Sequence, residues 1–213
     1  MIGKEKLRII ALPILLLLLT SVNAMSARTW EPGVYGGDYF VYEMYGIYTS
    51  NRSNTTMSIP EFEKNNTDWT RINITSISGS EVYQIYTLHF KNNSEFSFRF
   101  ETDLDPLNQG VFRMSEKGVP ICAANLGPGD RIPTADVTIN QTIIRVYADG
   151  SRETNHASWI GPDEWGDVYF DKESGMLVGL ERTHRFINTV TGSIVDKTDV
   201  IRLTDTNRWQ VKT

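Results

Sequence analysis

The sequence predicts an all-β protein built as an antiparallel meander. Segments in which apolar and polar residues alternate, the period of a half-buried strand, are separated by short stretches rich in Gly, Asn, Asp and Ser. The clearest segment is 94–101, where Phe96, Phe98 and Phe100 fall on one face and polar residues fall on the other. The chain shows neither an internal repeat nor a heptad pattern, which argues against a solenoid or a coiled coil.

The alternating segments indicate about nine or ten strands. In chain order they are expected at 34–48, 69–77, 82–91, 94–101, 111–114, 137–147, 151–160, 168–170, 176–187 and 194–204. Asp149 and Gly150 are expected at the tip of one hairpin, because glycine tolerates the positive φ of a tight turn. Residues 58–64 are expected to add a short helical segment, since Pro60 suits a first helical turn.

A long open sheet of this kind has two costly features, its unpaired edges and its uncovered apolar face. We therefore expect the meander to curl into a half-barrel or a barrel. A β-sandwich is the alternative, because periodicity alone separates these architectures poorly.

Residues 1–24 have the anatomy of a secretory signal peptide and are expected to form a signal helix. A basic start precedes an apolar run over 9–19, and Val22 and Ala24 occupy the −3 and −1 positions of a cleavage site. The run is shorter than the roughly 20 residues that span a bilayer, which favours cleavage over an uncleaved anchor. Residues 25–213 would then form a single extracytoplasmic domain. Its net charge falls from −5 to −7, because cleavage removes three basic residues and one acid.

Several N-x-S/T sequons accompany this export signal and indicate a glycoprotein from a cell that N-glycosylates, archaeal or eukaryotic. The acceptor positions are Asn51, Asn54, Asn65, Asn73, Asn92 and Asn140. An occupied sequon must face solvent. Asn73 alternates with Ile72 and Ile74, so a glycan there would leave the two isoleucines pointing inward.

Composition and motifs exclude several classes of function. The mature domain is acidic and has no Lys/Arg run, so nucleic acid is not expected as a partner. His89, His156 and His184 lack metal-ligand spacing, and no nucleophile elbow, P-loop or dinucleotide fingerprint is present. We therefore predict no catalytic residue, no metal and no cofactor. The single cysteine, Cys122, is expected to be a small buried residue, with an intermolecular disulfide as the alternative.

The stretch YADGSRETNHASW (147–159) gathers the residue types of an active site in a few positions. On a strand, however, Glu153 and His156 point to opposite faces, and Arg152 lies roughly 13 Å from His156. A general acid–base pair needs hydrogen-bond reach. We therefore interpret the stretch as an exposed polar hairpin strand with cross-strand hydrogen bonds, and ligand binding by this face as the alternative.

Aromatic residues carry the most informative signal for binding. The segments 39–48 and 83–90 are apolar on both faces, which is typical of strands buried on both sides or of a curled sheet that encloses a ligand cavity. For the cavity we predict a lining of Tyr42, Met44, Tyr45, Tyr86, Phe96, Phe98 and Phe100. A weaker signal is Asp163-Glu164 beside Trp159 and Trp165, a combination of carboxylates and stacking platforms found in glycan hydrolases.

Four stretches resemble a group of secreted or surface-anchored proteins predicted from archaeal genomes. They are NNTDWTRINITSISGSEVYQIYTLHFKNNSE (65–95), ICAANLGPGDRI (121–132), INQTIIRVYADGSRETNH (139–156) and VYFDKESGMLVGLE (168–181). RETNH and YFDKESGMLVGL are the most specific. The resemblance implies an archaeal origin but carries no activity or site residue. A fainter resemblance, of architecture alone, is to the half-barrel of bacterial lipoprotein carriers, and fold analogy is weak grounds for function.

These observations favour a non-enzymatic extracytoplasmic glycoprotein domain that is secreted or held at the cell surface. Its expected partner is an apolar ligand, for which a lipid is the leading candidate, or a protein of the cell envelope. The alternatives are a structural or adhesive envelope glycoprotein and, further behind, a glycan hydrolase. Contact with a membrane is expected only through residues 1–24, if they stay uncleaved.

Overall fold

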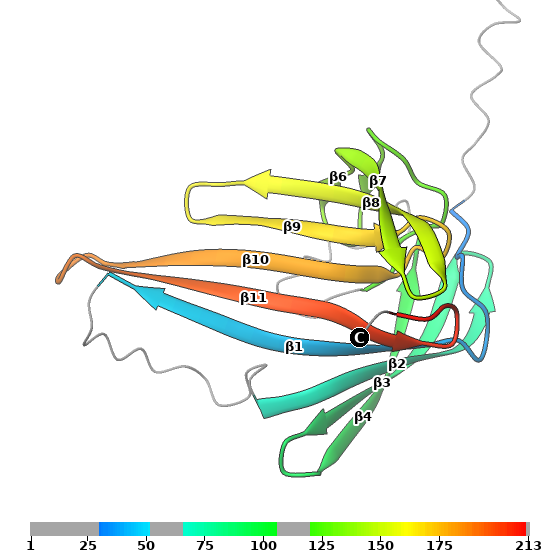
Figure 1. Cartoon of the computed structure of the whole chain (residues 1–213). Coiled ribbons are helices and arrows are strands. Elements are labelled where there is room, and N and C mark those ends of the chain that lie inside the picture. Colours follow the sequence, from blue (N-terminus) through cyan, green and yellow to red (C-terminus); the bar gives the residue numbers. More distant parts are fainter. Residues whose placement is uncertain (1–29, 52–65, 106–119, 212–213) are drawn as a thin grey trace, which may run out of the picture.

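The computed structural model of the chain describes residues 30–51, 66–105 and 120–211, and all regular structure in these residues is β-strand. The strands are β1 (Tyr39–Ser50), β2 (Thr67–Ser78), β3 (Glu81–Phe90), β4 (Glu95–Asp103), β5 (Arg131–Ile132), β6 (Val137–Thr138), β7 (Gln141–Tyr147), β8 (Gly150–Ile160), β9 (Glu164–Asp171), β10 (Leu177–Asn188) and β11 (Ser193–Thr206). Nine of them form one antiparallel sheet, and β5 and β6 pair separately (Figure 1). The predicted all-β class and the meander are confirmed.

The sheet is open, so the predicted half-barrel or barrel is wrong. The strand order is β4-β3-β2-β1-β11-β10-β9-β8-β7, and the edge strands β4 and β7 do not pair with each other. The sandwich alternative fails too, because the second sheet within the described residues has only two strands, β5 and β6, of two residues each. Instead of barrel closure, a covering segment of the chain, residues 120–139, buries the apolar face of the sheet. Its residues Ile121, Leu126 and Ile139 are fully buried against the sheet. Burial of the apolar face therefore does not require the edges to meet.

The meander consists of two halves joined at β1 and β11. Each half is a run of hairpins, β1 to β4 and β7 to β11, and the first strand of one pairs with the last strand of the other from Phe40–Thr206 to Ser50–Val195. The two ends of the domain therefore lie side by side in the middle of the sheet (Figure 1). Sequence periodicity locates the hairpins but does not predict this long-range join.

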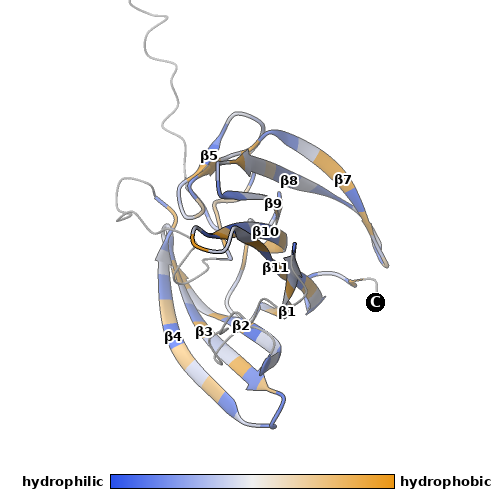
Figure 2. Ribbon diagram, turned by 90° about the vertical axis from the view of Figure 1, so that its left-hand side faces the viewer, coloured by the Kyte–Doolittle hydropathy of each residue, from blue (hydrophilic) through white to orange (hydrophobic). Residues whose placement is uncertain are grey.

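The sheet has two faces that differ in burial. The covered face carries Phe40, Ile72 and Phe170, each at most 2% exposed, and it continues across β3 and β4 because cross-strand partners such as Tyr86 and Phe98 share a face. The opposite, open face carries Tyr169 together with many charged residues. Figure 2 shows the hydropathy alternating along β3 and β4, as a strand with one covered face requires.

Some predicted details shift or fall outside the described residues. Tyr147 pairs with Gly150, so Ala148 and Asp149 form the hairpin tip and Gly150, with a φ of 142°, opens β8. The expected helical segment at 58–64, the strand at 111–114 and the signal peptide lie outside the described residues. Within 30–51, 66–105 and 120–211, no helix is long and apolar enough to span a membrane.

Gly175 locks the covering segment onto the sheet. It has a φ of +71°, and a Cβ there would lie 2.1 Å from the carbonyl oxygen of Cys122. The Cys122 amide donates to the Gly175 carbonyl at 2.9 Å, and Ile121 bridges to Met176. Cys122 itself is buried, as predicted, and burial raises the pKa of its thiol far above the usual range. The β9–β10 turn and the cover therefore form one unit.

We expect Gly175→Ala to destabilise the domain severely. The positive φ alone costs about 1–3 kcal/mol, and the clash with the Cys122 carbonyl adds to that cost. Gly37→Ala is the matched control, because Gly37 also has a positive φ (+96°) but nothing lies within 4 Å of its Cβ position. Urea denaturation should give a clearly larger loss for Gly175→Ala than for the control. Equal losses would show that the close approach to Cys122 does not hold the cover in place.

Candidate functional site

The stretch RETNH forms part of the structural framework. Arg152 on β8 donates to Asp171 at the end of β9 through Nε at 2.7 Å and Nη2 at 3.0 Å, and Asp171 is only 1% exposed. The same carboxylate accepts hydrogen bonds from the Ser174 amide and hydroxyl, at 2.8 and 2.7 Å. The pKa of the Arg152 guanidinium is raised, and its hydrogen bond to Asp171 is the largest cause. The Arg152 guanidinium also covers the Trp209 ring at 4.2 Å.

The other members of the stretch have separate structural partners. Asn155 is buried and donates to the Leu126 carbonyl at 2.9 Å, which holds the covering segment on the sheet. His156 contacts Asp167 at 2.7 Å and stacks on Tyr169 at 4.6 Å, whereas Glu153 binds Lys172. The predicted cross-strand hydrogen bonds are confirmed. The predicted exposure is wrong for Asn155, because its amide satisfies a carbonyl of the cover.

The two most specific resemblance stretches pair with each other. RETNH lies on β8 and YFDKESGMLVGL runs from β9 into β10, with Thr154 opposite Asp171 and His156 opposite Tyr169. The polar residues of one stretch are therefore interaction partners of polar residues in the other.

The sequons within the described residues lie as follows. Ile72 and Ile74 are buried and Asn73 points to the open face, so the predicted alternation is confirmed. Asn51, Asn92 and Asn140 are exposed, and each accepts a backbone hydrogen bond through its side chain. Asn54 and Asn65 lie outside the described residues.

The structure brings part of the predicted aromatic lining together. The Tyr86 ring lies 5.2 Å from Phe98 and 5.6 Å from Phe100, and Phe96 lies 5.8 Å from Phe98. The other three predicted residues do not share one face. Tyr42 and Tyr86 are buried in the core, and the Tyr42 hydroxyl donates to the Leu177 carbonyl at 3.0 Å. Met44 lies half-buried on the same face, whereas Tyr45 points to the open face, where Arg202 lies 5.6 Å from its ring.

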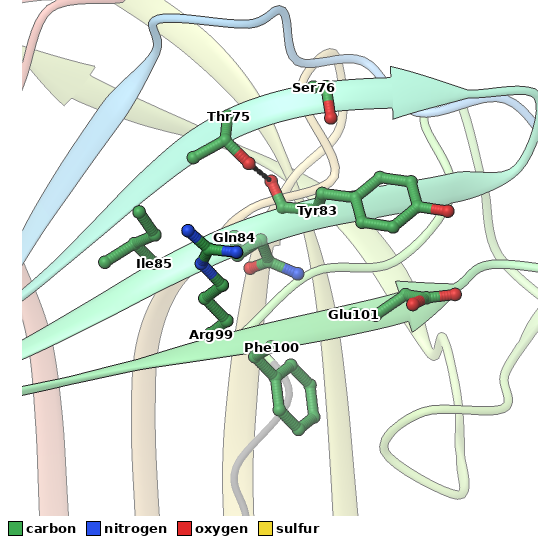
Figure 3. A pocket seen from close by; sticks show the side chains of 8 residues that line it. All are labelled: Thr75, Ser76, Tyr83, Gln84, Ile85, Arg99, Phe100 and Glu101. Atoms are coloured by element: carbon green, nitrogen blue, oxygen red, sulfur yellow. Dashed lines mark hydrogen bonds between the residues drawn. The ribbon is translucent and has the colours of Figure 1, made fainter.

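The three phenylalanines of β4 become less exposed along the strand. Phe96 and Phe98 are exposed, and Phe100 is half-buried. Phe100 lines a depression of about 520 Å³ between β2, β3 and β4 (Figure 3). Figure 3 shows that Thr75, Tyr83 and Glu101 also line this depression.

The proposed carboxylate and tryptophan site is not assembled either. Trp159 pairs with Gly166, whereas Trp165 is the adjacent residue on β9, so the two indoles lie on opposite faces of the sheet. The Glu164 carboxylate contacts His184 at 3.4 Å. Among the described residues no three His, Cys, Asp or Glu side chains gather as a metal-ion site.

A larger cavity lies on the open face of the second half of the sheet. This cavity, which we call the trough, has a volume of about 690 Å³. It is lined by Ile143, Ile144, Arg145, Val146, Tyr147, Tyr169, Val178, Gly179, Leu180, Glu181, Val200, Ile201, Arg202, Leu203 and Val211. The side chains on the open face are Ile143, Arg145, Tyr147, Tyr169, Glu181, Val200 and Arg202, whereas Val178, Leu180, Ile201 and Leu203 point to the covered face. The trough is therefore partly apolar and partly charged, and five consecutive residues of β7 form one wall.

The floor of the trough is a row of three cross-strand neighbours. Gly179 on β10 lies between Tyr169 on β9 and Arg202 on β11. A Cβ on Gly179 would lie 3.5 Å from both Arg145 Nη1 and the Tyr169 ring. The absence of a side chain at Gly179 therefore leaves space between two arginines.

The C-terminal segment closes one end of the trough. The Ala148 amide donates to the Gln210 carbonyl at 3.1 Å, and the Gln210 amide donates to Asp149 at 2.9 Å. Trp209 is buried there, with its ring 6.1 Å from that of Tyr147. None of the trough residues was predicted from the sequence. The only local signal is the run 143–146 (IIRV), which is apolar on both faces of an edge strand and carries one arginine.

We expect Arg152→Ala to cost about 3 kcal/mol or more in unfolding free energy, because it leaves the buried Asp171 charge without its partner. Arg185→Ala is the matched control: Arg185 also forms a bidentate pair, with Asp196 at 2.8 Å, but that pair is more exposed. Urea denaturation should show a much smaller loss for the control. Equal losses would mean that the buried pair is no more important than a surface pair.

Comparisons with known proteins give no match, so the function is argued from the geometry of the structure. No protein-family model matches the sequence, and no curated protein matches it.

Proposed function

We propose that the chain is a non-enzymatic extracytoplasmic glycoprotein domain that binds an elongated apolar ligand, a lipid, in the trough. The observation that carries the proposal is a cavity of about 690 Å³, in the size range of small-molecule sites, whose walls are partly apolar and partly polar. Val200 contributes a side chain that is buried in the sheet, and Ile143 and Val211 add apolar surface. The signal-peptide anatomy and the sequons support a location outside the cytoplasm.

The architecture of the trough favours a ligand with a long apolar part. Its floor spans β9, β10 and β11, and the wall from β7 follows the strand over 143–147. Trp209 and Val211 close one end, so a ligand enters from the side or from the other end. Burial of apolar ligand surface there supplies roughly 25 cal/mol per Å².

An envelope partner is a second candidate, favoured by one observation. Phe96 and Phe98 are exposed next to each other on the edge strand β4, with ring centroids 5.8 Å apart. Exposed aromatic pairs are common at protein interfaces. This surface lies in the other half of the sheet from the trough.

The proposal is tested by binding of N-phenyl-1-naphthylamine, a neutral apolar probe whose fluorescence rises in apolar sites. Ile143→Asn places an amide in the apolar wall and should weaken binding by about tenfold, because an unpaired amide is costly to desolvate. Ile160→Asn is the matched control on β8, since Ile160 is exposed and does not line the trough. Near-UV circular dichroism would verify that both variants fold.

Three results would argue against the trough. The first is no probe binding to the unmodified protein. The second is an equal loss of probe affinity in Ile143→Asn and Ile160→Asn, and the third is an unchanged probe affinity in Ile143→Asn. If replacing Phe96 and Phe98 abolishes probe binding and Ile143→Asn does not change it, the apolar site lies on β4.

A further inference from the structure

The trough contains an arginine that has no carboxylate partner. Arg145 on β7 is half-buried, and its guanidinium stacks over the Tyr169 ring at 4.3 Å. No carboxylate of the described residues lies within ion-pair distance of it, although most other arginines of the sheet have one. Stacking leaves the edge N–H groups of a guanidinium free to donate. Arg145 is therefore positioned to bind an acceptor that is not part of the fold.

The second arginine of the trough is held only loosely. Arg202 Nη1 lies 3.9 Å from Glu43, at the limit of an ion pair. It is the cross-strand partner of Gly179, and Arg145 Nη1 lies 3.5 Å from where a Cβ of Gly179 would be. The space above Gly179 is thus flanked by two positive charges. This is unusual in a chain whose formal net charge is −5.

A buried hydroxyl beside Arg145 also lacks a hydrogen bond. The Tyr147 Oη atom is buried and has no partner within normal hydrogen-bond geometry. Burial raises the pKa of Tyr147, and the neighbouring Arg145 and Thr154 side chains lower it in part, so the phenol stays neutral and can donate. The Thr154 hydroxyl also lacks a partner of normal geometry, and a bound acceptor would give the Tyr147 hydroxyl such a partner.

The carboxylate in the trough limits where a negative charge can bind. Glu181 is exposed and lies two residues from Gly179 along β10, opposite Asp167 on β9. An anion is therefore repelled at the Glu181 end and attracted at Arg145 and Gly179. The apolar surface of the trough comes from Ile143, Val200 and Val211.

From this arrangement we propose that the ligand of the trough is an anionic amphiphile, whose phosphate or carboxylate head binds Arg145, Tyr147 and Arg202 above Gly179 while its alkyl chain covers the apolar wall. This inference rests on the proposed function and adds the chemical class of the ligand. A planar guanidinium suits either oxyanion, because it can donate two parallel hydrogen bonds.

The test compares four amphiphiles with one chain length and different heads: dodecyl phosphate, dodecanoate, dodecanol and dodecyltrimethylammonium. Each would be titrated below its micelle concentration against the full secreted chain, with displacement of N-phenyl-1-naphthylamine as the readout. The phosphate or the carboxylate should bind on the order of tenfold to a hundredfold more tightly than the alcohol. The cation should bind most weakly. Inorganic phosphate should not displace the probe, because it lacks the apolar chain.

Three variants assign the head group to its site. Arg145→Gln should remove most of the preference for the anionic heads over dodecanol. Tyr147→Phe should weaken binding of the anionic amphiphile a few-fold, because it removes one donor to the head group. Arg99→Gln is the matched control, since Arg99 lies on β4 at the depression of Figure 3.

The outcomes separate the two proposals. Equal affinity for all four heads, or a preference that survives Arg145→Gln, would overturn the anionic head while leaving the apolar site intact. An unchanged affinity in Tyr147→Phe would remove the hydroxyl from the site. Failure of every amphiphile and of the neutral probe to bind would overturn the proposed function itself. A preference for the phosphate over the carboxylate, or the reverse, identifies the head.

Discussion

The buried ion pair between Arg152 and Asp171 is the interaction on which the rest of the structure depends. An ionised carboxylate that is almost completely removed from solvent is stable only when its lone pairs are satisfied, and Arg152 and Ser174 supply those donors. The pair joins β8 to the turn after β9. It also provides the cationic platform on which Trp209 rests. Trp209 packs beside Tyr147, and Val211 lines the trough, so the ion pair also supports one end of the cavity.

The sheet can remain open because its two faces are buried in different ways. One face is covered by residues 120–139 of the same chain, so its apolar side chains are buried without barrel closure. The other face remains partly open, and there the β7 wall and the C-terminal segment leave a cavity lined by apolar residues, two tyrosines, two arginines and Glu181. The proposed site lies on the face that the covering segment does not use.

Polar residues of this protein divide into two groups with different physical roles. Those of RETNH are clustered in sequence, mutually paired or bonded to the backbone, and they stabilise the fold. Arg145 and Tyr147 are only two residues apart, yet one has no carboxylate and the other no hydrogen bond among the described residues. Polar residues that are clustered in the sequence therefore stabilise the fold in this protein. Polar residues that lack such partners in the folded structure lie at the candidate site.

The sequence by itself determined the all-β class, most strand positions and the inward direction of Ile72 and Ile74, because these depend on local periodicity. It also indicated that Glu153 and His156 do not act as a pair, since alternation on a strand separates them. The tertiary structure decided the pairing of β1 with β11, the covering role of residues 120–139 and the trough, all of which depend on contacts between residues far apart in the chain. The opposite directions of Tyr42 and Tyr45 follow from strand alternation, whereas the tertiary structure places the larger cavity away from the aromatic strands. Local periodicity fixes which way a side chain points relative to its neighbours, whereas only long-range packing fixes what it points at.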